Sequence, residues 1–295
     1  NGVYNRATID FASPGITPTG EPGNIALCPA ADDAKWAILL PQSDATATAT
    51  IGGITYAIES FPNITNNYYN NTGVAISSSE VFNANTNPLT FEAKVSGATV
   101  NFNSPSNIGA TMVYSTDGGN SWTTYSNNTD ITLENVGDKV SFRAENSNSA
   151  LGSRVLRTCS RFTVNGECYL YGNIMSLLFT DYENATELDY YDSYTFSNLF
   201  YHVTDIYNHP TKQLLLPATQ LAPYCYAHLF DGCTNLTTAP ALPANTLQDY
   251  CYQYMFNGCT NLTTAPALNA TELDGYCYSY MFTNCTSLTT APAQS

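Results

Sequence analysis

A 26-residue unit repeats almost verbatim near the C-terminal end of the chain, and no other feature constrains the fold as strongly. One copy, LAPYCYAHLFDGCTNLTTAPALPANT, begins at Leu221, the next, LQDYCYQYMFNGCTNLTTAPALNATE, begins at Leu247, and a third begins at Leu273. Self-similarity at one fixed period is typical of a solenoid, in which neighbouring units stack on one another. Solenoids present extended surfaces that bind other molecules. The repeat therefore indicates recognition rather than catalysis, without indicating what is recognised.

Within one unit, the apolar pattern predicts a short helix followed by a short strand. Steps of four and three residues place the apolar positions on one helical face. In the second copy these positions are Leu247, Cys251, Met255, Phe256, Cys259 and Leu262. Gly258 suits the left-handed close of the helix, and the extended segment 262–268 follows. The period lies in the range of about 20–29 residues of leucine-rich repeats. We expect an α/β leucine-rich-repeat solenoid in which Leu236, Leu262 and Leu288 form one buried column.

A fourth and divergent copy precedes the three regular ones. Phe200, Val203 and Ile206 match the apolar positions that begin at Phe230 one copy later. The interval between these two phenylalanines is 30 residues, because the loop around His209 is four residues longer. An atypical terminal repeat is expected where a solenoid needs a cap.

Nine cysteines invite a disulfide or metal interpretation, but the helical prediction argues against both for the six in the repeats. Cys225 and Cys233 would be about 12 Å apart along one helix. Cys225 and Cys251 would lie on helices whose axes are about 8–10 Å apart, whereas the Cα atoms of a disulfide lie within about 7 Å. We expect six free, buried thiols that pack as small apolar groups. Whether Cys159 and Cys168 pair stays open.

The first half of the chain shows short strands separated by turn residues. Segments 45–51 and 54–60 flank Gly52-Gly53, and such a pair supplies the positive φ of a hairpin turn. A further strand is expected at 34–40. Seven more short strands are predicted at 89–95, 99–103, 111–115, 121–125, 130–133, 139–145 and 155–164. Seven short strands with turn signals between them are typical of a β-sandwich.

Residues 115–122 read S-T-D-G-G-N-S-W and match the S-x-D-x-G-x-[ST]-W pattern of an Asp-box. In this pattern Asp117 accepts backbone N–H groups across the turn, Gly119 adopts positive φ and Trp122 is buried beside the hairpin. Sialidases contain several such hairpins, remote from their catalytic residues. A single one on so small a domain predicts a structural turn.

Composition and motifs argue against several functions. A formal net charge of −15 at pH 7 argues against nucleic-acid binding and against attraction to anionic lipid. No run of about 20 apolar residues could span a membrane. His202, His209 and His228 show no metal-ligand spacing, and no nucleophile motif is present. We predict a non-enzymatic protein without cofactor or metal. The chain begins without Met and stops inside a repeat, so we expect a fragment of a longer protein.

The repeat motif C-Y-x-x-M-F-x-G-C-T-N-L-T-T-A-P-A-L resembles that of BspA-like leucine-rich-repeat surface proteins from Gram-negative gut and oral anaerobes, and we assign residues 166–295 to it. Residues 1–82, where W-A-I-L-L-P-Q precedes a hairpin, resemble part of a fimbrillin-like (Mfa-like) domain. Residues 83–165 resemble the β-sandwich spacers found between such domains. The resemblance implies an outer-membrane-attached, cell-surface adhesion protein that contacts a host or matrix protein. A glycan-binding module and a pilus-associated subunit are the alternatives.

Tyrosines that recur at the repeat period supply the candidate binding residues. Tyr250 and Tyr276 form one column, and Tyr254 and Tyr280 form another. The helical prediction places them beside the buried stripe, so at least one column should reach the surface. Two interpretations stay open: the rings shield neighbouring helices, or the exposed column anchors a protein or a sugar. We also expect the open C-terminal repeat, from Leu288 onward, either to be buried against another molecule, including a second copy, or to show disorder.

Overall fold

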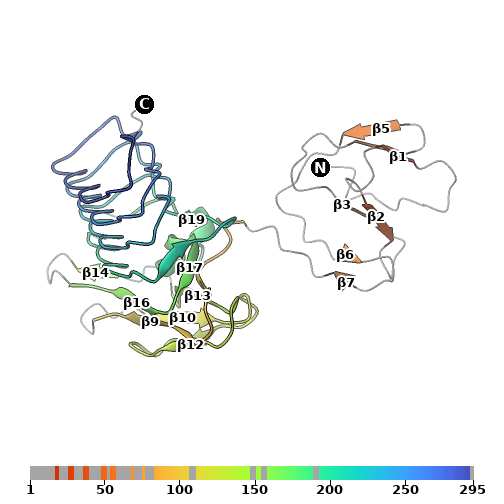
Figure 1. The fold of residues 1–295 in the computed structure, drawn as a ribbon, viewed down its shortest axis with the longest axis horizontal. Coiled ribbons are helices and arrows are strands. Elements are labelled where there is room, and N and C mark those ends of the chain that lie inside the picture. Colours follow the sequence, from red (N-terminus) through yellow and green to blue (C-terminus); the bar gives the residue numbers. More distant parts are fainter. Residues whose placement is uncertain are drawn as a thin grey trace. The chain divides into compact units, whose positions relative to one another are not determined.

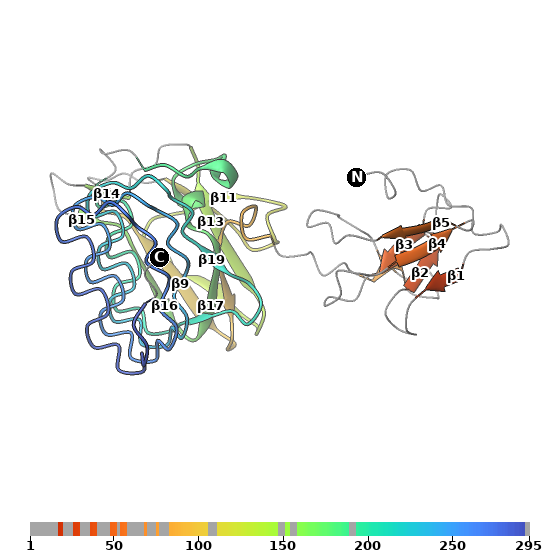
Figure 2. The same ribbon diagram turned by 90° about the horizontal axis from the view of Figure 1, so that it is seen from above.

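The chain forms two compact units, residues 1–83 and residues 84–295, in a computed structural model (Figures 1 and 2). The structure describes residues 83–105, 111–146, 151–153, 158–188 and 193–292, together with the backbone of seven strands in the first unit. Helical structure in this described part is limited to two short 3-10 turns, η2 (Ile174–Leu177) and η3 (Tyr182–Asn184). None of the described helical segments is long and apolar enough to cross a membrane.

The first unit contains small antiparallel sheets. Its described strands are β1 (Thr17–Thr19), β2 (Ala26–Pro29), β3 (Trp36–Leu39), β4 (Thr48–Ile51), β5 (Ile54–Ala57), β6 (Tyr68–Tyr69) and β7 (Ala75–Ile76). β4 pairs with β5 so that Ile51 lies opposite Ile54, which confirms the predicted hairpin. β3 falls within the strand predicted at 34–40 and pairs with β2. The rest of the segment that resembles a fimbrillin-like domain, including residues 40–42, lies outside the described part.

Two sheets make up the first half of the second unit. The larger sheet has the order β11-β10-β13-β8-β17-β18, with β19 also paired to β17, and the smaller sheet has the order β12-β9-β16. The strands of the larger sheet are β8 (Leu89–Ala93), β10 (Met112–Ser115), β11 (Thr123–Thr124), β13 (Lys139–Ala144), β17 (Cys168–Asn173), β18 (Ile206–Asn208) and β19 (Leu214–Leu215). Those of the smaller sheet are β9 (Ala98–Asn103), β12 (Ile131–Leu133) and β16 (Arg161–Asn165). β14 (Gly152–Ser153) and β15 (Thr158–Cys159) form a separate pair. Each of the seven strands predicted from residue 89 to residue 164 is thus present at least in part, with 155–164 divided between β15 and β16.

Phenylalanine rings from both sheets fill the space between them. Side chains alternate along a strand, so β8 directs Phe91 into this core and Glu92 to the opposite face. The ring of Phe162, on the smaller sheet, lies 5.0 Å from that of Phe91 and 5.1 Å from that of Phe142, between centroids. All three side chains are fully buried. The two sheets therefore pack face to face through an aromatic cluster.

The larger sheet continues into the segment that was predicted to belong to the repeats. β17 pairs antiparallel with β8 and parallel with β18 and β19, which come from the divergent first repeat. The ring of Phe200 in that repeat stacks on Phe162 at 5.7 Å between centroids. The sheets and the repeats share one hydrophobic core, and the boundary expected between residues 165 and 166 falls inside this unit.

The repeats stack as coils, but the predicted helices are absent from residues 193–292, so this part of the leucine-rich-repeat prediction is wrong. The segment 222–233 is instead a run of successive turns, which we call the turn ribbon; it recurs at 248–259 and 274–285, and at 193–203 in the divergent copy. Every second N–H bonds to the carbonyl oxygen three residues earlier, as from Cys225 to Ala222 (3.2 Å). The alternate N–H groups bond to the following coil, as from Tyr226 to Cys251 (3.0 Å). On the ribbon, each coil thus donates to the coil after it.

Every fourth residue of the turn ribbon has a left-handed backbone. In the Leu221 copy these residues are Tyr224 (φ 59°), His228 (φ 56°) and Gly232 (φ 78°). The same positions recur as Tyr250, Tyr254 and Gly258, and as Tyr276, Tyr280 and Asn284. Left-handed φ costs a residue with a Cβ atom about 1–2 kcal/mol. Hydrogen bonds between coils and stacking of rings offset this cost at each tyrosine.

The strict period of four residues fits the turn ribbon better than a helix. On an α-helix, with 3.6 residues per turn, each step of four residues rotates a side chain by about 40°. The side chains of Cys225, Leu229 and Cys233 would then spread over about 80°, and equivalent side chains would not lie in line. The turn ribbon keeps them in line, and all three are fully buried.

Inside the stack, equivalent positions form straight columns. Phe200, Phe230, Phe256 and Phe282 stack at centroid separations of 5.5, 5.6 and 5.7 Å, with neighbouring rings within 10° of parallel. Leu236 and Leu262 are buried and Leu288 is half-buried, which confirms the predicted leucine column for its first two members.

The strand predicted in each repeat reduces to single bridges between coils. Thr238 pairs with Thr264, and Thr246 pairs with Glu272, both in parallel. The segment 262–268 forms no strand, in agreement with Pro266, because proline has no N–H to donate. Individual backbone bonds, such as that from Thr263 N to Thr237 O (2.9 Å), hold this side of the stack together.

Candidate functional site

Two outward-facing columns of stacked rings contain the four predicted binding residues. The Tyr250 ladder consists of Tyr194, Tyr224, Tyr250 and Tyr276, with centroid separations of 4.5, 4.5 and 5.0 Å and ring planes within 9° of parallel. The Tyr254 ladder consists of His228, Tyr254 and Tyr280, with separations of 4.8 Å and planes within 11°. Both ladders are built from left-handed residues of the turn ribbon. The structure therefore brings Tyr250 beside Tyr276 and Tyr254 beside Tyr280.

Stacking determines which parts of the ladder rings are exposed to a binding partner. Each ring within a ladder is covered on its faces by its neighbours, so only its edge and its polar tip point outward. The last rings differ: Tyr276 is 67% exposed and Tyr280 is 59% exposed. In the described part of the chain no ring covers their outer faces. Burial and the neighbouring tyrosines raise the pKa of Tyr224 and of Tyr250, so these two hydroxyls stay neutral at physiological pH.

A third tyrosine column faces the core instead. Phe196, Tyr226, Tyr252 and Tyr278 stack at centroid separations of 5.5, 5.9 and 5.8 Å. Tyr226 and Tyr252 are almost completely buried. The hydroxyl of Tyr226 has no hydrogen-bond partner among the described atoms. This column is therefore part of the packing and not of a binding surface.

A buried carboxylate, that of Asp231, contacts the first ring of the Tyr254 ladder. Asp231 Oδ2 lies 2.7 Å from His228 Nδ1, and Asp231 Oδ1 accepts a hydrogen bond from Asn257 Nδ2 (2.8 Å). Asp231 is buried, while His228 is only half-buried. The contact orients the imidazole so that its ring stacks on Tyr254.

The six repeat cysteines are free and buried, as predicted. The distance argument for this was wrong, however, because coils that bond in register lie about 4.7–4.9 Å apart, not 8–10 Å. Burial, reinforced by the neighbouring thiol of Cys277, raises the pKa of Cys251 to about 12, and a thiol that stays protonated oxidises slowly. In the second column each thiol also donates to the preceding coil, as from Cys259 Sγ to the Phe230 carbonyl oxygen (3.1 Å).

The possible pair of Cys159 and Cys168 does not form, because both are free. Cys168 is buried within β17, and Cys159 is half-buried beside Asn198, whose Nδ2 lies 3.8 Å from its sulfur. Burial raises the pKa of the Cys168 thiol to about 12.

The Asp-box folds as the structural turn that its sequence predicts. Asp117 Oδ1 accepts hydrogen bonds from the N–H of Ser121 (3.0 Å) and the hydroxyl of Ser115 (2.7 Å), and Asp117 Oδ2 accepts one from the Ser121 hydroxyl (2.6 Å). These bonds lower the pKa of Asp117 to about 2. Gly119 has φ 92°. Trp122 is half-buried rather than buried, and the guanidinium of Arg143 lies 4.2 Å from its ring centroid.

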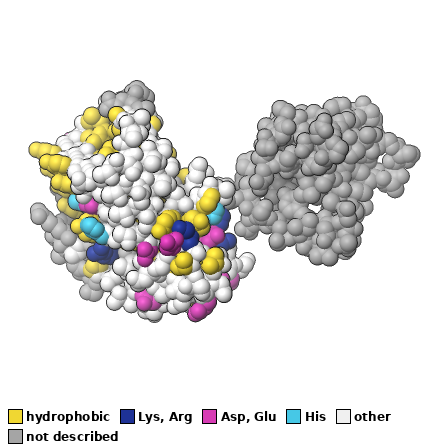
Figure 3. All heavy atoms as spheres, viewed as in Figure 1, with side chains coloured by type: hydrophobic (Ala, Val, Ile, Leu, Met, Phe, Trp, Pro, Cys, Tyr) yellow, Lys and Arg dark blue, Asp and Glu magenta, His cyan; other side chains and the backbone are white. Residues whose placement is uncertain are grey.

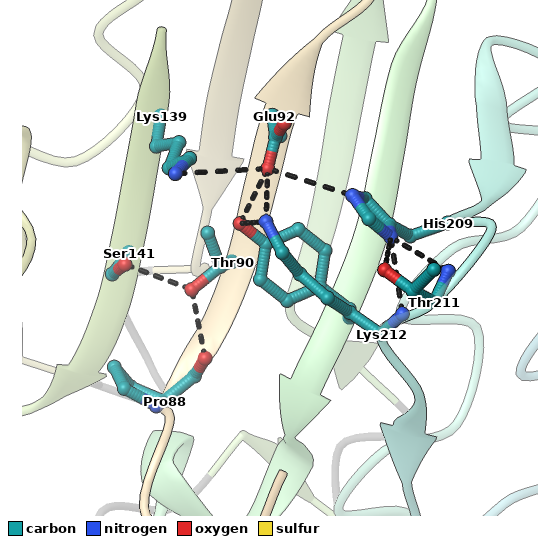
Figure 4. A network of polar contacts seen from close by, with 9 residues as sticks. Pro88, Thr90, Glu92, Lys139, Ser141, His209, Thr211 and Lys212 are labelled. Carbon is teal, nitrogen blue, oxygen red and sulfur yellow. Dashed lines mark hydrogen bonds and ion pairs between the residues drawn. The ribbon is translucent and has the colours of Figure 1, made fainter. Parts of the chain in front are cut away.

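A polar cluster on the outer face of the larger sheet was missed by the sequence analysis. Glu92 Oε2 accepts hydrogen bonds from Lys212 Nζ (2.6 Å) and Tyr171 Oη (2.7 Å), as Figure 4 shows for the labelled residues. Lys139 Nζ and His209 Nε2 each lie 3.9 Å from the same oxygen. We call these five residues the Glu92 cluster. The surface view shows acidic, basic and histidine side chains beside hydrophobic ones on one face of this unit (Figure 3).

Three strands and one loop bring the Glu92 cluster together. Neighbouring strands β8, β13 and β17 supply Glu92, Lys139 and Tyr171, while His209 and Lys212 come from the loop between β18 and β19. This is the loop that is four residues longer in the divergent repeat. The insertion was therefore the signal that could have located the cluster, because the residue types alone match no motif.

The His209 ring closes this loop on itself. Its Nδ1 accepts hydrogen bonds from the backbone N–H groups of Thr211 (3.1 Å) and Lys212 (3.0 Å). A nitrogen that accepts hydrogen bonds is unprotonated, so the imidazole proton lies on Nε2, toward the carboxylate. The rings of Tyr169 and Tyr171 pack edge-to-face against the imidazole at 5.0 and 5.2 Å.

Electrostatics in the Glu92 cluster favour a structural role. Burial opposes the charge of Glu92, but the hydrogen bonds from Lys212 and Tyr171 outweigh it, so the pKa of Glu92 is lowered. Burial and the positive charge of Lys212 lower the pKa of His209. The cluster thus holds an ionised carboxylate and a neutral imidazole near neutral pH, and both are engaged within it. Among the described residues, no group of three or more His, Cys, Asp or Glu side chains could hold a metal ion.

Comparison of the chain with protein-family models, with curated proteins and with solved structures finds no match. The resemblance of the repeats to BspA-like surface proteins therefore rests on the repeat motif alone. The two ring ladders are the most regular feature of the described surface.

Proposed function

We propose that this protein is a non-enzymatic adhesion protein that contacts a host or matrix protein through the Tyr250 and Tyr254 ladders. The observation that carries the proposal is the regular exposure of stacked aromatic side chains at left-handed positions, where a tyrosine is costly for the fold. Tyrosine is frequent at binding hot spots, because it combines a large apolar ring with a hydroxyl that can donate and accept. The motif resemblance supports a location on the cell surface, attached to the outer membrane.

The orientation of the rings favours a protein partner along the sides of the ladders. A sugar that stacks on an aromatic residue needs a free ring face. Within the ladders the faces are covered by neighbouring rings at 4.5–5.0 Å. Ring edges and hydroxyls remain, and these suit the mixed polar and apolar surface of a protein.

Replacing ladder residues by asparagine tests the proposal. Asparagine adopts left-handed φ more readily than other residues with a Cβ atom, and the chain already places Asn198 (φ 58°) and Asn284 (φ 61°) at such positions of the ribbon. We expect Tyr250→Asn with Tyr254→Asn to weaken binding to an arrayed matrix protein about 30-fold or more, as loss of a hot spot of about 2 kcal/mol requires.

The control variant changes two exposed threonines outside the turn ribbon, on the side where Thr263 bonds to Thr237. Thr237→Ala with Thr263→Ala should leave binding unchanged, because neither side chain belongs to a ladder. Circular dichroism and thermal unfolding must show that both double variants keep the fold. Binding that survives the ladder change but is lost with the threonine change would move the contact surface to the threonine side.

Glycan binding is the second candidate, and one observation favours it at a restricted place. Tyr276 and Tyr280 present free ring faces in the described part of the chain. A sugar ligand should therefore be lost in Tyr276→Asn with Tyr280→Asn and retained in Tyr250→Asn with Tyr254→Asn. A glycan array probed with both double variants separates this function from protein adhesion, which depends on the whole length of the ladders.

A further inference from the structure

We propose that the loop at residues 209–213 is an acid-sensitive latch, which stays closed on the larger sheet while His209 is neutral and opens when His209 is protonated. The loop is the insertion of the first repeat, and it reaches across β17 to place Lys212 on Glu92 (Figure 4). The proposal concerns this cluster alone and is independent of the proposed adhesion function.

The closed loop requires the neutral imidazole. Nδ1 of His209 accepts two backbone hydrogen bonds, from Thr211 N–H (3.1 Å) and Lys212 N–H (3.0 Å). The arrangement copies a turn in which an Asn or Asp side chain accepts the N–H groups two and three residues ahead. Protonation of Nδ1 turns the acceptor into a donor. Three donors then face one another, so the turn cannot keep its geometry.

Lys212 connects the turn to the larger sheet. Lys212 supplies both the backbone N–H that bonds to His209 and the ammonium that bonds to Glu92 at 2.6 Å. The next residue, Gln213, accepts a hydrogen bond from Gly172 N–H on β17 (2.9 Å). A turn that opens at His209 therefore withdraws the ammonium from the carboxylate.

The charged and titratable groups around the imidazole set the pH of the change. Glu92 on β8 favours protonation of His209, whereas Lys139 on β13, Lys212 on the loop and burial of the ring oppose it. Tyr169 and Tyr171 on β17 pack edge-to-face against the ring. Burial is the largest effect, and the pKa of His209 lies below its ordinary value of 6.5. The latch is therefore closed at neutral pH and opens under mildly acidic conditions.

A matched variant separates protonation from every other effect of acid. In His209→Asn the side-chain oxygen can accept the same two N–H groups, and it cannot be protonated in this range. For spectroscopy, His202→Asn with His228→Asn leaves His209 as the sole imidazole. Asparagine suits the backbone at both sites, because the chain itself has Asn284 in the column of His202 and Asn198 in that of His228. At position 228 the asparagine amide can donate to Asp231 in place of the imidazole.

The measurement is amide hydrogen exchange at Thr211 and Lys212 by NMR, corrected for intrinsic rates, from about pH 8 to about pH 5, where histidine titrates. We expect protection in the otherwise unchanged chain to fall by up to about tenfold per pH unit once the pH drops below about 6.5, and protection in His209→Asn to stay constant. An equal fall in both proteins would overturn the latch.

Imidazole nitrogen shifts provide a second test that needs no change at position 209. In the His202→Asn, His228→Asn chain, they should report the proton on Nε2 at neutral pH and on both nitrogens in acid. The amide shifts of Thr211 and Lys212 should follow the same titration curve. An imidazole that titrates while these amides do not respond would contradict the proposal, even if His209→Asn failed to fold.

Discussion

A buried hydroxyl in the inner column carries a cost that its neighbour in the stack avoids. Tyr226 is 1% exposed, and its hydroxyl has no hydrogen-bond partner among the described atoms. Phe196 holds the equivalent place one coil earlier and stacks on the same ring. A buried polar group without a partner costs about 1–3 kcal/mol.

We therefore expect Tyr226→Phe to raise the free energy of unfolding by about 1 kcal/mol, since the ring stays and the unpaired hydroxyl is removed. Urea denaturation followed by circular dichroism measures the change. Tyr252→Phe, one coil later, is the control and should give a smaller effect, because the Tyr252 hydroxyl is not among the buried groups that lack a partner. A destabilised Tyr226→Phe would show that the hydroxyl is bonded in solution.

The leucine column allows the loss of stability on creating a cavity to be compared between a fully buried and a half-buried residue. Leu262 is completely buried, whereas Leu288 is half-buried. Leu262→Ala should lower the free energy of unfolding by about 2–5 kcal/mol, because the stacked coils cannot collapse onto the space left behind. Leu288→Ala should cost clearly less. Equal losses in chemical denaturation would mean that the column is not packed as the structure shows.

At the scale of the element, the sequence predicted which residues are buried better than the backbone that buries them. Cys251, Met255 and Cys259 were placed on one face, and all three are buried. Their spacing of four was taken for a helix, since steps of three and four both fit one helical face. The tyrosines at Tyr250 and Tyr254 keep the same strict period, and that agreement between columns was the available signal against 3.6 residues per turn. Left-handed tyrosines are too rare to be expected from sequence.

Glycine at the third left-handed position of the ribbon provides a test of the turn ribbon. Gly258 has φ 73°, and a Cβ atom there would lie 3.6 Å from its nearest neighbour, so space is not limiting. Gly258→Ala should cost about 1–2 kcal/mol through the backbone alone, and Gly258→Asn should cost less, as Asn284 holds the same position. Thermal unfolding decides between them.

A helical segment would give the opposite order, because alanine favours helices and asparagine does not. Gly232 supplies the steric comparison, since a Cβ atom there would lie 2.6 Å from Nδ1 of His202. Gly232→Ala should therefore be more destabilising than Gly258→Ala.

At the scale of the molecule, the repeats and the sheets form one body that the sequence divided in two. The sequence pattern does change near residue 166, from short strands to repeats, and the predicted division followed that change. The pairing of β17 with β8 on one side and with β18 on the other joins segments far apart in the chain. No local pattern reports such pairing, and the Glu92 cluster depends on it. The bond between Glu92 and Lys212 joins residues that are 120 positions apart, so neither side chain indicates the other in the sequence.

The free energy of unfolding should fall on acidification, because the pKa values of two groups are lowered in the folded state. The folded state resists protonation of His209, so the unfolded chain binds that proton first and stability declines below about pH 6.5. The pKa of Glu92 is also lowered, so its contribution is complete above about pH 4.5 and is lost as the pH falls through the folded value. Urea unfolding at a series of pH values should show both stages.

Two variants show which residue causes each stage of the stability loss. His209→Asn should remove the upper stage. Glu92→Gln should reduce the lower stage without abolishing it, because Asp117 and Glu167 have lowered pKa values as well. Stability that stays constant from neutral pH to about pH 4 would be incompatible with both assignments.

The hydrogen bonds of the turn ribbon give each coil two unlike edges. One edge carries N–H donors, and the opposite edge carries carbonyl acceptors. Tyr224, Tyr226 and His228 donate to the following coil, and the carbonyl oxygens of that coil accept. The edge of an ordinary strand alternates donors and acceptors, which lets two copies of one strand pair and aggregate. Two ribbon edges of the same kind would bring N–H against N–H and repel each other. Contact between copies at the C-terminal coil would therefore have to be made by side chains such as Leu273 and Tyr276, which are 64% and 67% exposed.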